Sequence, residues 1–247
     1  AALSGRFRCI AYSARGYLPS DVPERDDAYG YEQAWRDLAA VVEQAAGGAA
    51  HIVGLSMGAY AGLMLALNRP ELVRSLTFAG GGTGSTRQPN DLLRKRMEAL
   101  AQVFLQEGSA AAAARIAAHP NREGFRRRDP AGWQAWYDDL CDHSALGMAL
   151  TYRNYQGMRP SLYDFEARLR ALAVPVLLCI GDEDPACLEI NLFLKETVPD
   201  AGLWMAPHSG HAINLEAPEA FNFMVGAFVE RVERGRLATN APDSPPS

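Results

Sequence analysis

The sequence contains no long apolar segment. Across its 247 residues, no run reaches the ~20 residues that a membrane-spanning helix needs, so we predict no membrane partner. Basic charge is also limited, since 24 Lys and Arg stand against 29 Asp and Glu. The one basic cluster, residues 126–128, is followed at once by Asp129, and we interpret it as a solvated loop. Because nucleic-acid surfaces are basic, we predict no nucleic-acid partner.

Cysteine is scarce as well. The four cysteines, Cys9, Cys141, Cys179 and Cys187, show neither paired spacing nor a metal-ligand pattern. Cys9 and Cys179 fall in apolar runs that we interpret as buried strands, where a free thiol behaves as a small hydrophobe. This usage favours a reducing compartment. We therefore predict a cytoplasmic protein that holds no metal and no other cofactor.

The most informative segment that is present is Gly-Leu-Ser-Met-Gly at residues 54–58. It follows a short apolar β-type run and precedes a long apolar helical pattern. Ser56 is therefore predicted at a sharp strand-to-helix turn, which exposes its hydroxyl toward a base. Small residues two before and two after the serine let the backbone segments approach each other. The N–H of Met57 is predicted at a helix N-terminus, which favours negative charge.

Two later segments complete an ordered set of serine, acid and histidine. The apolar run 174–180 predicts a buried parallel strand and ends in the acid-rich loop 181–185. A further short strand precedes residues 207–211, which hold His208 and His211. A serine, an acid after a late strand and a histidine after the last strand is the order of an α/β-hydrolase triad.

Residues 14–17, 54–58, 181–185 and 209–218 together resemble the α/β-hydrolase fold superfamily, and in particular serine hydrolases of the esterase and lactonase type. The resemblance runs from about residue 8 to about residue 232. It implies an α/β fold, a mostly parallel sheet with helices on both faces and an all-helical cap. It also implies Ser56 as nucleophile, His211 as base and the Met57 N–H as oxyanion donor. As the acid it favours Asp184.

Each of these assignments has a competitor in the sequence. Asp182 and Glu183 share the acid-rich loop with Asp184, and all of them could be turn residues. His208 lies nearer the strand than His211 and could line a pocket or a surface turn. The position just before proline selects Asp184, and the Ser-Gly-His pattern selects His211.

The alternation of strands and helices supports the same architecture. Strands are predicted at 8–12, 51–55, 75–79, 176–180 and 202–205, and helices at 31–46, 59–68, 90–106, 109–119, 130–142, 145–155 and 218–234. We assign residues 1–84 and 159–236 to the hydrolase core and residues 85–158 to the helical cap. Residues 237–247 lack core-forming side chains and are predicted to be a disordered tail.

The start of the sequence departs from the family pattern. Such enzymes begin with further strands, the third of which ends in a His-Gly loop that supplies the second oxyanion N–H. Residues 8–12 look like the fourth strand, and no His-Gly loop precedes them. We therefore expect a fragment of a longer hydrolase, weakly active and marginally stable by itself.

Several large side chains gather in the second half of the cap, among them Trp133, Trp136, Tyr137 and Met148. Their helical spacing makes packing within the cap the simpler explanation, and the alternative is an apolar pocket for the substrate. The predicted function is hydrolysis of a small apolar carboxylic ester or lactone through an acyl-enzyme. Two alternatives stay open, namely hydrolysis of a C–C bond in a diketone and a non-catalytic ligand-binding protein.

Overall fold

The computed structural model describes residues 2–88 and 90–239. A four-stranded parallel sheet in the order β1-β2-β3-β4 forms its centre. The strands are β1 Ala50–Leu55, β2 Val73–Ala79, β3 Val176–Gly181 and β4 Ala201–Ala206. The register places Leu55 beside Ala79 and Ala79 beside Cys179. The carboxyl ends of these strands therefore meet at one edge of the sheet, where parallel α/β folds carry their sites.

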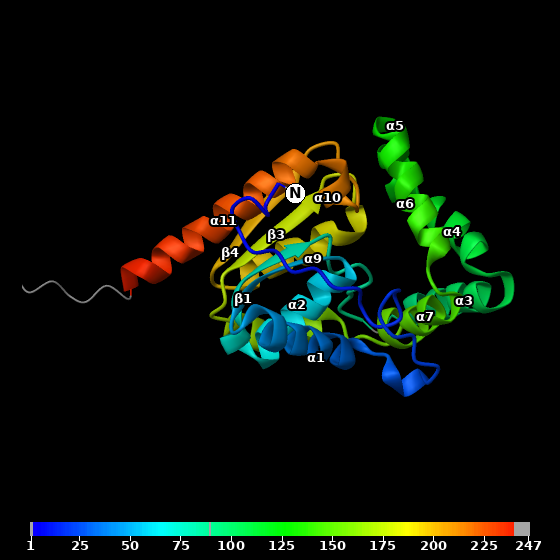
Figure 1. Ribbon diagram of the computed structural model, residues 1–247, viewed down its shortest axis with the longest axis horizontal. Coiled ribbons are helices and arrows are strands. Elements are labelled where there is room, and N and C mark those ends of the chain that lie inside the picture. Colours follow the sequence, from blue (N-terminus) through cyan, green and yellow to red (C-terminus); the bar gives the residue numbers. More distant parts are fainter. Residues whose placement is uncertain (1, 89, 240–247) are drawn as a thin grey trace, which may run out of the picture.

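Helices cover both faces of the sheet (Figure 1). One apolar cluster joins the sheet to α1 Tyr31–Val41, α2 Met57–Asn68 and α9 Pro185–Thr197. The other joins it to α10 Ile213–Glu216 and α11 Pro218–Thr239. Burial on both faces explains why β3 is a continuous apolar run with all of its residues buried. The predicted parallel α/β architecture is confirmed.

The remaining core elements are short. They are η1 Asp26–Ala28, η2 Val42–Ala46, η3 Pro70–Leu72, η6 Leu162–Phe165 and α8 Glu166–Arg170. Near the amino end, Leu3 and Phe7 pack against the apolar cluster of α11, and Figure 1 shows the start of the chain beside that helix.

An all-helical segment separates β2 from β3 and projects to one side of the sheet (Figure 1). Its elements are α3 Asp91–Glu107, α4 Ser109–Ala117, η4 Pro120–Arg122, α5 Glu123–Arg128, α6 Pro130–Asp142, α7 Ala145–Leu150 and η5 Thr151–Gln156. Phe104, Ala112, Leu140 and Met148 belong to an apolar cluster of its own. We call this segment the cap.

The prediction of a strand at residues 8–12 is wrong. These residues are exposed and irregular, and Cys9 is exposed rather than buried. A strand needs a neighbour for its ladder hydrogen bonds. Within residues 2–88 and 90–239, the free edge of β1 has no strand beside it.

Two further sequence predictions need correction. Residues 126–128 form the last turn of α5 rather than a loop, because Asp129 ends that helix and caps α6 by accepting from the Gly132 N–H at 2.9 Å. Helix α11 continues past Gly235 to Thr239, since one interior glycine costs only about 1 kcal/mol. The predicted disordered tail is therefore wrong for residues 237–239, and residues 240–247 lie outside the described part.

Among the described helices, none has the length and apolar character that crossing a membrane requires.

Candidate active site

Ser56 occupies a strained turn between β1 and α2. Its φ is 51° and its ψ is −106°, an unusual conformation for a residue other than glycine. A Cβ on Gly54 would lie 2.3 Å from the Gly58 carbonyl group, whereas a Cβ on Gly58 would meet nothing within 4 Å. The predicted need for small residues on both sides therefore holds for Gly54 only. The turn is further fixed by the Ser56 N–H, which donates to the Ala79 carbonyl at 2.8 Å.

The side chains of Ser56, His211 and Asp184 form one hydrogen-bonded chain. His211 Nε2 lies 3.0 Å from Ser56 Oγ, and His211 Nδ1 lies 2.6 Å from Asp184 Oδ2. An ionised carboxylate can only accept, so Nδ1 carries the proton that faces Asp184. Nε2 is then the acceptor for the serine hydroxyl. This arrangement can withdraw a proton from Ser56.

Asp184 is suited to remain ionised in this place. It is only 1 % exposed, and burial alone would raise its pKa. The hydrogen bond and charge of His211, with smaller contributions from Cys187 and Asn121, outweigh that effect and hold the pKa of Asp184 below its ordinary value. A buried carboxylate of this kind stabilises an imidazolium beside it.

The competing residues of both loops lie elsewhere. Asp182 accepts a hydrogen bond from the Ser209 N–H at 3.2 Å, and Glu183 pairs with Arg128 at 2.9 Å. His208 is exposed, with a φ of 52°. The acid-rich loop thus divides its carboxylates among different partners, and only Asp184 faces the imidazole.

Asp184, Cys187 and His211 place potential metal-ligand atoms within 4.8 Å of one another. Their hydrogen bonds account for this cluster. Cys187 Sγ donates to the Gly80 carbonyl at 3.4 Å, and burial raises the pKa of Cys187, which keeps it a thiol. The three side chains are thus held together by hydrogen bonds of the site itself.

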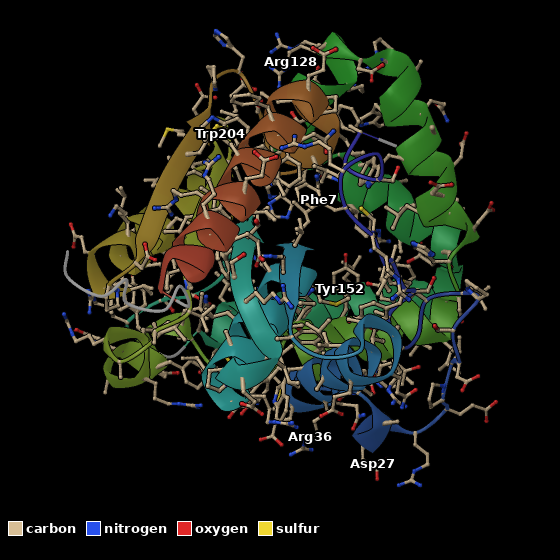
Figure 2. The ribbon with its side chains drawn as sticks, turned by 60° about the vertical axis from the view of Figure 1, so that its left-hand side comes forward. Phe7, Asp27, Arg36, Arg128, Tyr152 and Trp204 are labelled. Carbon is tan, nitrogen blue, oxygen red and sulfur yellow. The ribbon has the colours of Figure 1, made fainter. Side chains whose placement is uncertain are left out.

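Glu216 fixes the loop that carries His211. This role was not predicted from the sequence, in which Glu216 was noted only as part of the 209–218 segment. Its Oε2 accepts from the Gly210 N–H at 2.8 Å and its Oε1 from the Ala212 N–H at 3.0 Å. These two amides flank His211. The Glu216 side chain is 0 % exposed and also pairs with Arg128 of α5 at 2.9 Å. Figure 2 shows Arg128 where the green cap meets the orange C-terminal elements.

Met57 is the first residue of α2, so its N–H has no acceptor within the helix. That N–H adjoins Ser56 and can donate to an anion beside the serine hydroxyl. The Tyr155 hydroxyl of η5 donates to the Met57 carbonyl at 2.9 Å. A cavity of about 60 Å³ opens next to Met57 and Gly58, with space for a few water molecules.

The aromatic residues predicted as pocket lining lie in several places. Met148 is 2 % exposed and belongs to the apolar cluster of the cap, so packing inside the cap accounts for its burial. The rings of Trp133 and Tyr137 stack at 5.4 Å. Trp136 lies 5.0 Å from the guanidinium of Arg122, which belongs to η4.

A family model described as the alpha/beta hydrolase fold matches residues 1–218. The chain belongs to the alpha/beta hydrolase fold family. This hydrolase is 30% identical over 222 residues to a 2-(acetamidomethylene)succinate hydrolase of Mesorhizobium japonicum, with 88% of this chain and 76% of that protein covered. It is 26% identical over 229 residues to 3-oxoadipate enol-lactonase 2 of Acinetobacter baylyi, with 92% and 80% covered.

Solved structures agree on the fold of this hydrolase. A thermophilic esterase from Thermogutta terrifontis superposes with a TM-score of 0.81 at 22% identity, and the match covers 93% of this chain and 82% of that one. The family and its relatives make this protein an enzyme of the hydrolase type.

Proposed function

We propose that this hydrolase cleaves a small carboxylic ester or lactone through an acyl-enzyme intermediate, with Ser56 as nucleophile, His211 as general base and Asp184 as the group that orients the imidazole. The observation that carries the proposal is the continuous hydrogen-bonded chain from Ser56 Oγ through both ring nitrogens of His211 to Asp184. A serine hydroxyl is a weak nucleophile and needs such a base.

The proposed reaction follows from this geometry. His211 Nε2 takes the Ser56 proton as Oγ attacks the carbonyl carbon, and Asp184 stabilises the imidazolium. The Met57 N–H donates to the developing oxyanion, for which such donors typically contribute about 10²–10³ in kcat. The imidazolium then protonates the leaving alkoxide. Water activated by the same nitrogen releases the acid from Ser56.

The ester or lactone class is supported by the names of the relatives, which include an enol-lactonase and a thermophilic esterase. Hydrolysis of a C–C bond would use the same three side chains.

We also propose a core of residues 1–84 and 159–236 beneath a cap of residues 85–158, with Trp133, Trp136 and Tyr137 as an apolar wall toward the substrate. The four free thiols support the proposal of a cytoplasmic location.

The experiment that tests this function is labelling with a fluorophosphonate, followed by peptide mass spectrometry. Label is expected on Ser56 and is expected to vanish in Ser56→Ala. Ser109→Ala is the matched control, since that serine donates to the His143 carbonyl within the cap. Labelling of another residue, or none in a folded protein, contradicts the proposal. Initial rates with p-nitrophenyl esters, lactones and diketones then separate ester from C–C cleavage.

A further inference from the structure

The turn η4 is the place where the cap touches the histidine loop. The Asn121 carbonyl oxygen approaches Gly210 so closely that a Cβ there would lie 2.5 Å away. Asn121 is also among the neighbours that hold the pKa of Asp184 low. Arg122 follows Asn121 directly in the chain and therefore starts beside this contact.

The neighbours of the Arg122 guanidinium come from both sides of the gap between cap and core. The groups whose charge acts on it are Tyr152, Glu216, Asp184 and Cys187. Of these, Tyr152 belongs to η5 of the cap and the others follow strands of the core. Its guanidinium lies 5.0 Å from the Trp136 ring. Arg122 therefore lies, partly buried, between the cap and the core loops that carry Asp184 and Glu216.

In the described part of the chain, no carboxylate forms a salt bridge with Arg122. Its acidic neighbours are engaged elsewhere, since Asp184 bonds to His211 and Glu216 pairs with Arg128. Burial lowers the pKa of Arg122, which indicates that water compensates its charge incompletely. Arg126 and Arg128, on the helix that follows, both have carboxylate partners.

We propose that Arg122 binds a carboxylate carried by the acyl part of the substrate, so that this hydrolase acts on anionic esters or lactones. A guanidinium binds a carboxylate through two parallel N–H donors. The Trp136 ring holds one face of the guanidinium, and the N–H groups at its edge stay available to a ligand. This inference rests on the proposed function and narrows its substrate class.

The test compares two esters of the same shape. p-Nitrophenyl hemisuccinate carries a terminal carboxylate, and p-nitrophenyl 4-methylpentanoate places two methyl groups where its oxygens lie. The measured quantity is the ratio of kcat/KM for the anionic ester to kcat/KM for the neutral ester. We expect a ratio above one in the parent chain, a fall of about tenfold or more in Arg122→Met, and partial recovery in Arg122→Lys.

Arg127→Met is the matched control, because it removes the same charge from an exposed position of α5. Its ratio of kcat/KM values is expected to stay within about twofold of the parent ratio, because exposed charges typically contribute little interaction free energy. A parent ratio below one, an unchanged ratio in a folded Arg122→Met, or an equal fall in Arg127→Met overturns the inference, while hydrolysis of the neutral ester still supports the proposed function.

Binding of glutarate by calorimetry supplies a readout that needs no turnover. We expect glutarate to bind the parent chain and Arg127→Met equally, and to bind Arg122→Met about tenfold more weakly. Should neither ester be hydrolysed, the proposed function fails and this measurement decides the role of Arg122 alone. Glutarate affinity that is equal in all three proteins, or undetectable in the parent, overturns the inference.

Discussion

Arg128 in the cap and Glu216 in the core are 88 residues apart in the chain, yet Arg128 Nη2 lies 2.9 Å from Glu216 Oε2. The same carboxylate accepts from the amides on both sides of His211. The other end of the guanidinium reaches Glu183, beside Asp184. One cap residue thus contacts both loops that hold the proposed acid and base, and we infer that the docked cap helps to position them.

This contact predicts the effect of Arg128→Met. Loss of the guanidinium leaves the buried Glu216 carboxylate with the two backbone amides alone, which costs about 1 kcal/mol or more. We expect a lower Tm and a kcat reduced by about threefold to thirtyfold. The change in KM should be smaller, because the substitution disturbs the orientation of the His211 imidazole and removes no contact with the substrate. Arg127→Met is the control. Equal kinetics in both variants would show that the docked cap has no influence on His211.

The different contacts of neighbouring loop residues predict different effects of substitution, for Asp184 against Asp182 and for His211 against His208. Asp184→Asn and His211→Ala should each lower kcat by about 10⁴-fold. Asp182→Asn removes only an acceptor for the Ser209 N–H, and His208→Ala removes an exposed ring. Both should change kcat by less than about tenfold. Steady-state ester hydrolysis measures all four, and comparable losses within either pair would reverse our assignment.

The elbow geometry predicts opposite outcomes for its two glycines. An added methyl on Gly54 would meet the backbone of Gly58 and Ala59 at 2.3–2.5 Å, so Gly54→Ala must distort the turn that presents Ser56. We expect loss of fluorophosphonate labelling together with a lower Tm. Gly58→Ala places its methyl in open space within α2 and should gain up to about 1 kcal/mol of helix stability. A labelled, stable Gly54→Ala would refute this account of the elbow.

Burial of the thiols predicts how alkylation depends on pH. Burial raises the pKa of Cys179 to about 12 and also raises that of Cys187. A raised thiol pKa means that the protonated, unreactive form persists at higher pH. With iodoacetamide at pH 8, Cys9 on the surface should react in the native protein, and Cys179 and Cys187 should react only in denaturant. Peptide mapping checks this, and native alkylation of Cys187 would contradict the packing beside Asp184.

The local features of this hydrolase were predictable from its sequence because neighbouring residues create them. The apolar run of β3 signals burial on both faces, and the glycine-flanked Ser56 signals a strand-to-helix turn. Ser56, Asp184 and His211 follow β1, β3 and β4, and parallel topology brings the carboxyl ends of these strands to one edge of the sheet. In the structure the three side chains form one hydrogen-bonded chain, and their catalytic roles stay a prediction.

Contacts between distant segments were decided by the tertiary structure alone. Helical spacing could not tell whether Met148 faces a pocket or the interior of the cap, because a buried face has the same period in both cases. Residues 8–12 have strand-like composition, but a strand exists only where a neighbour completes its ladder. The partners of Arg122 and Arg128 are set by how the cap docks on the core, and no pattern within the cap sequence specifies that docking.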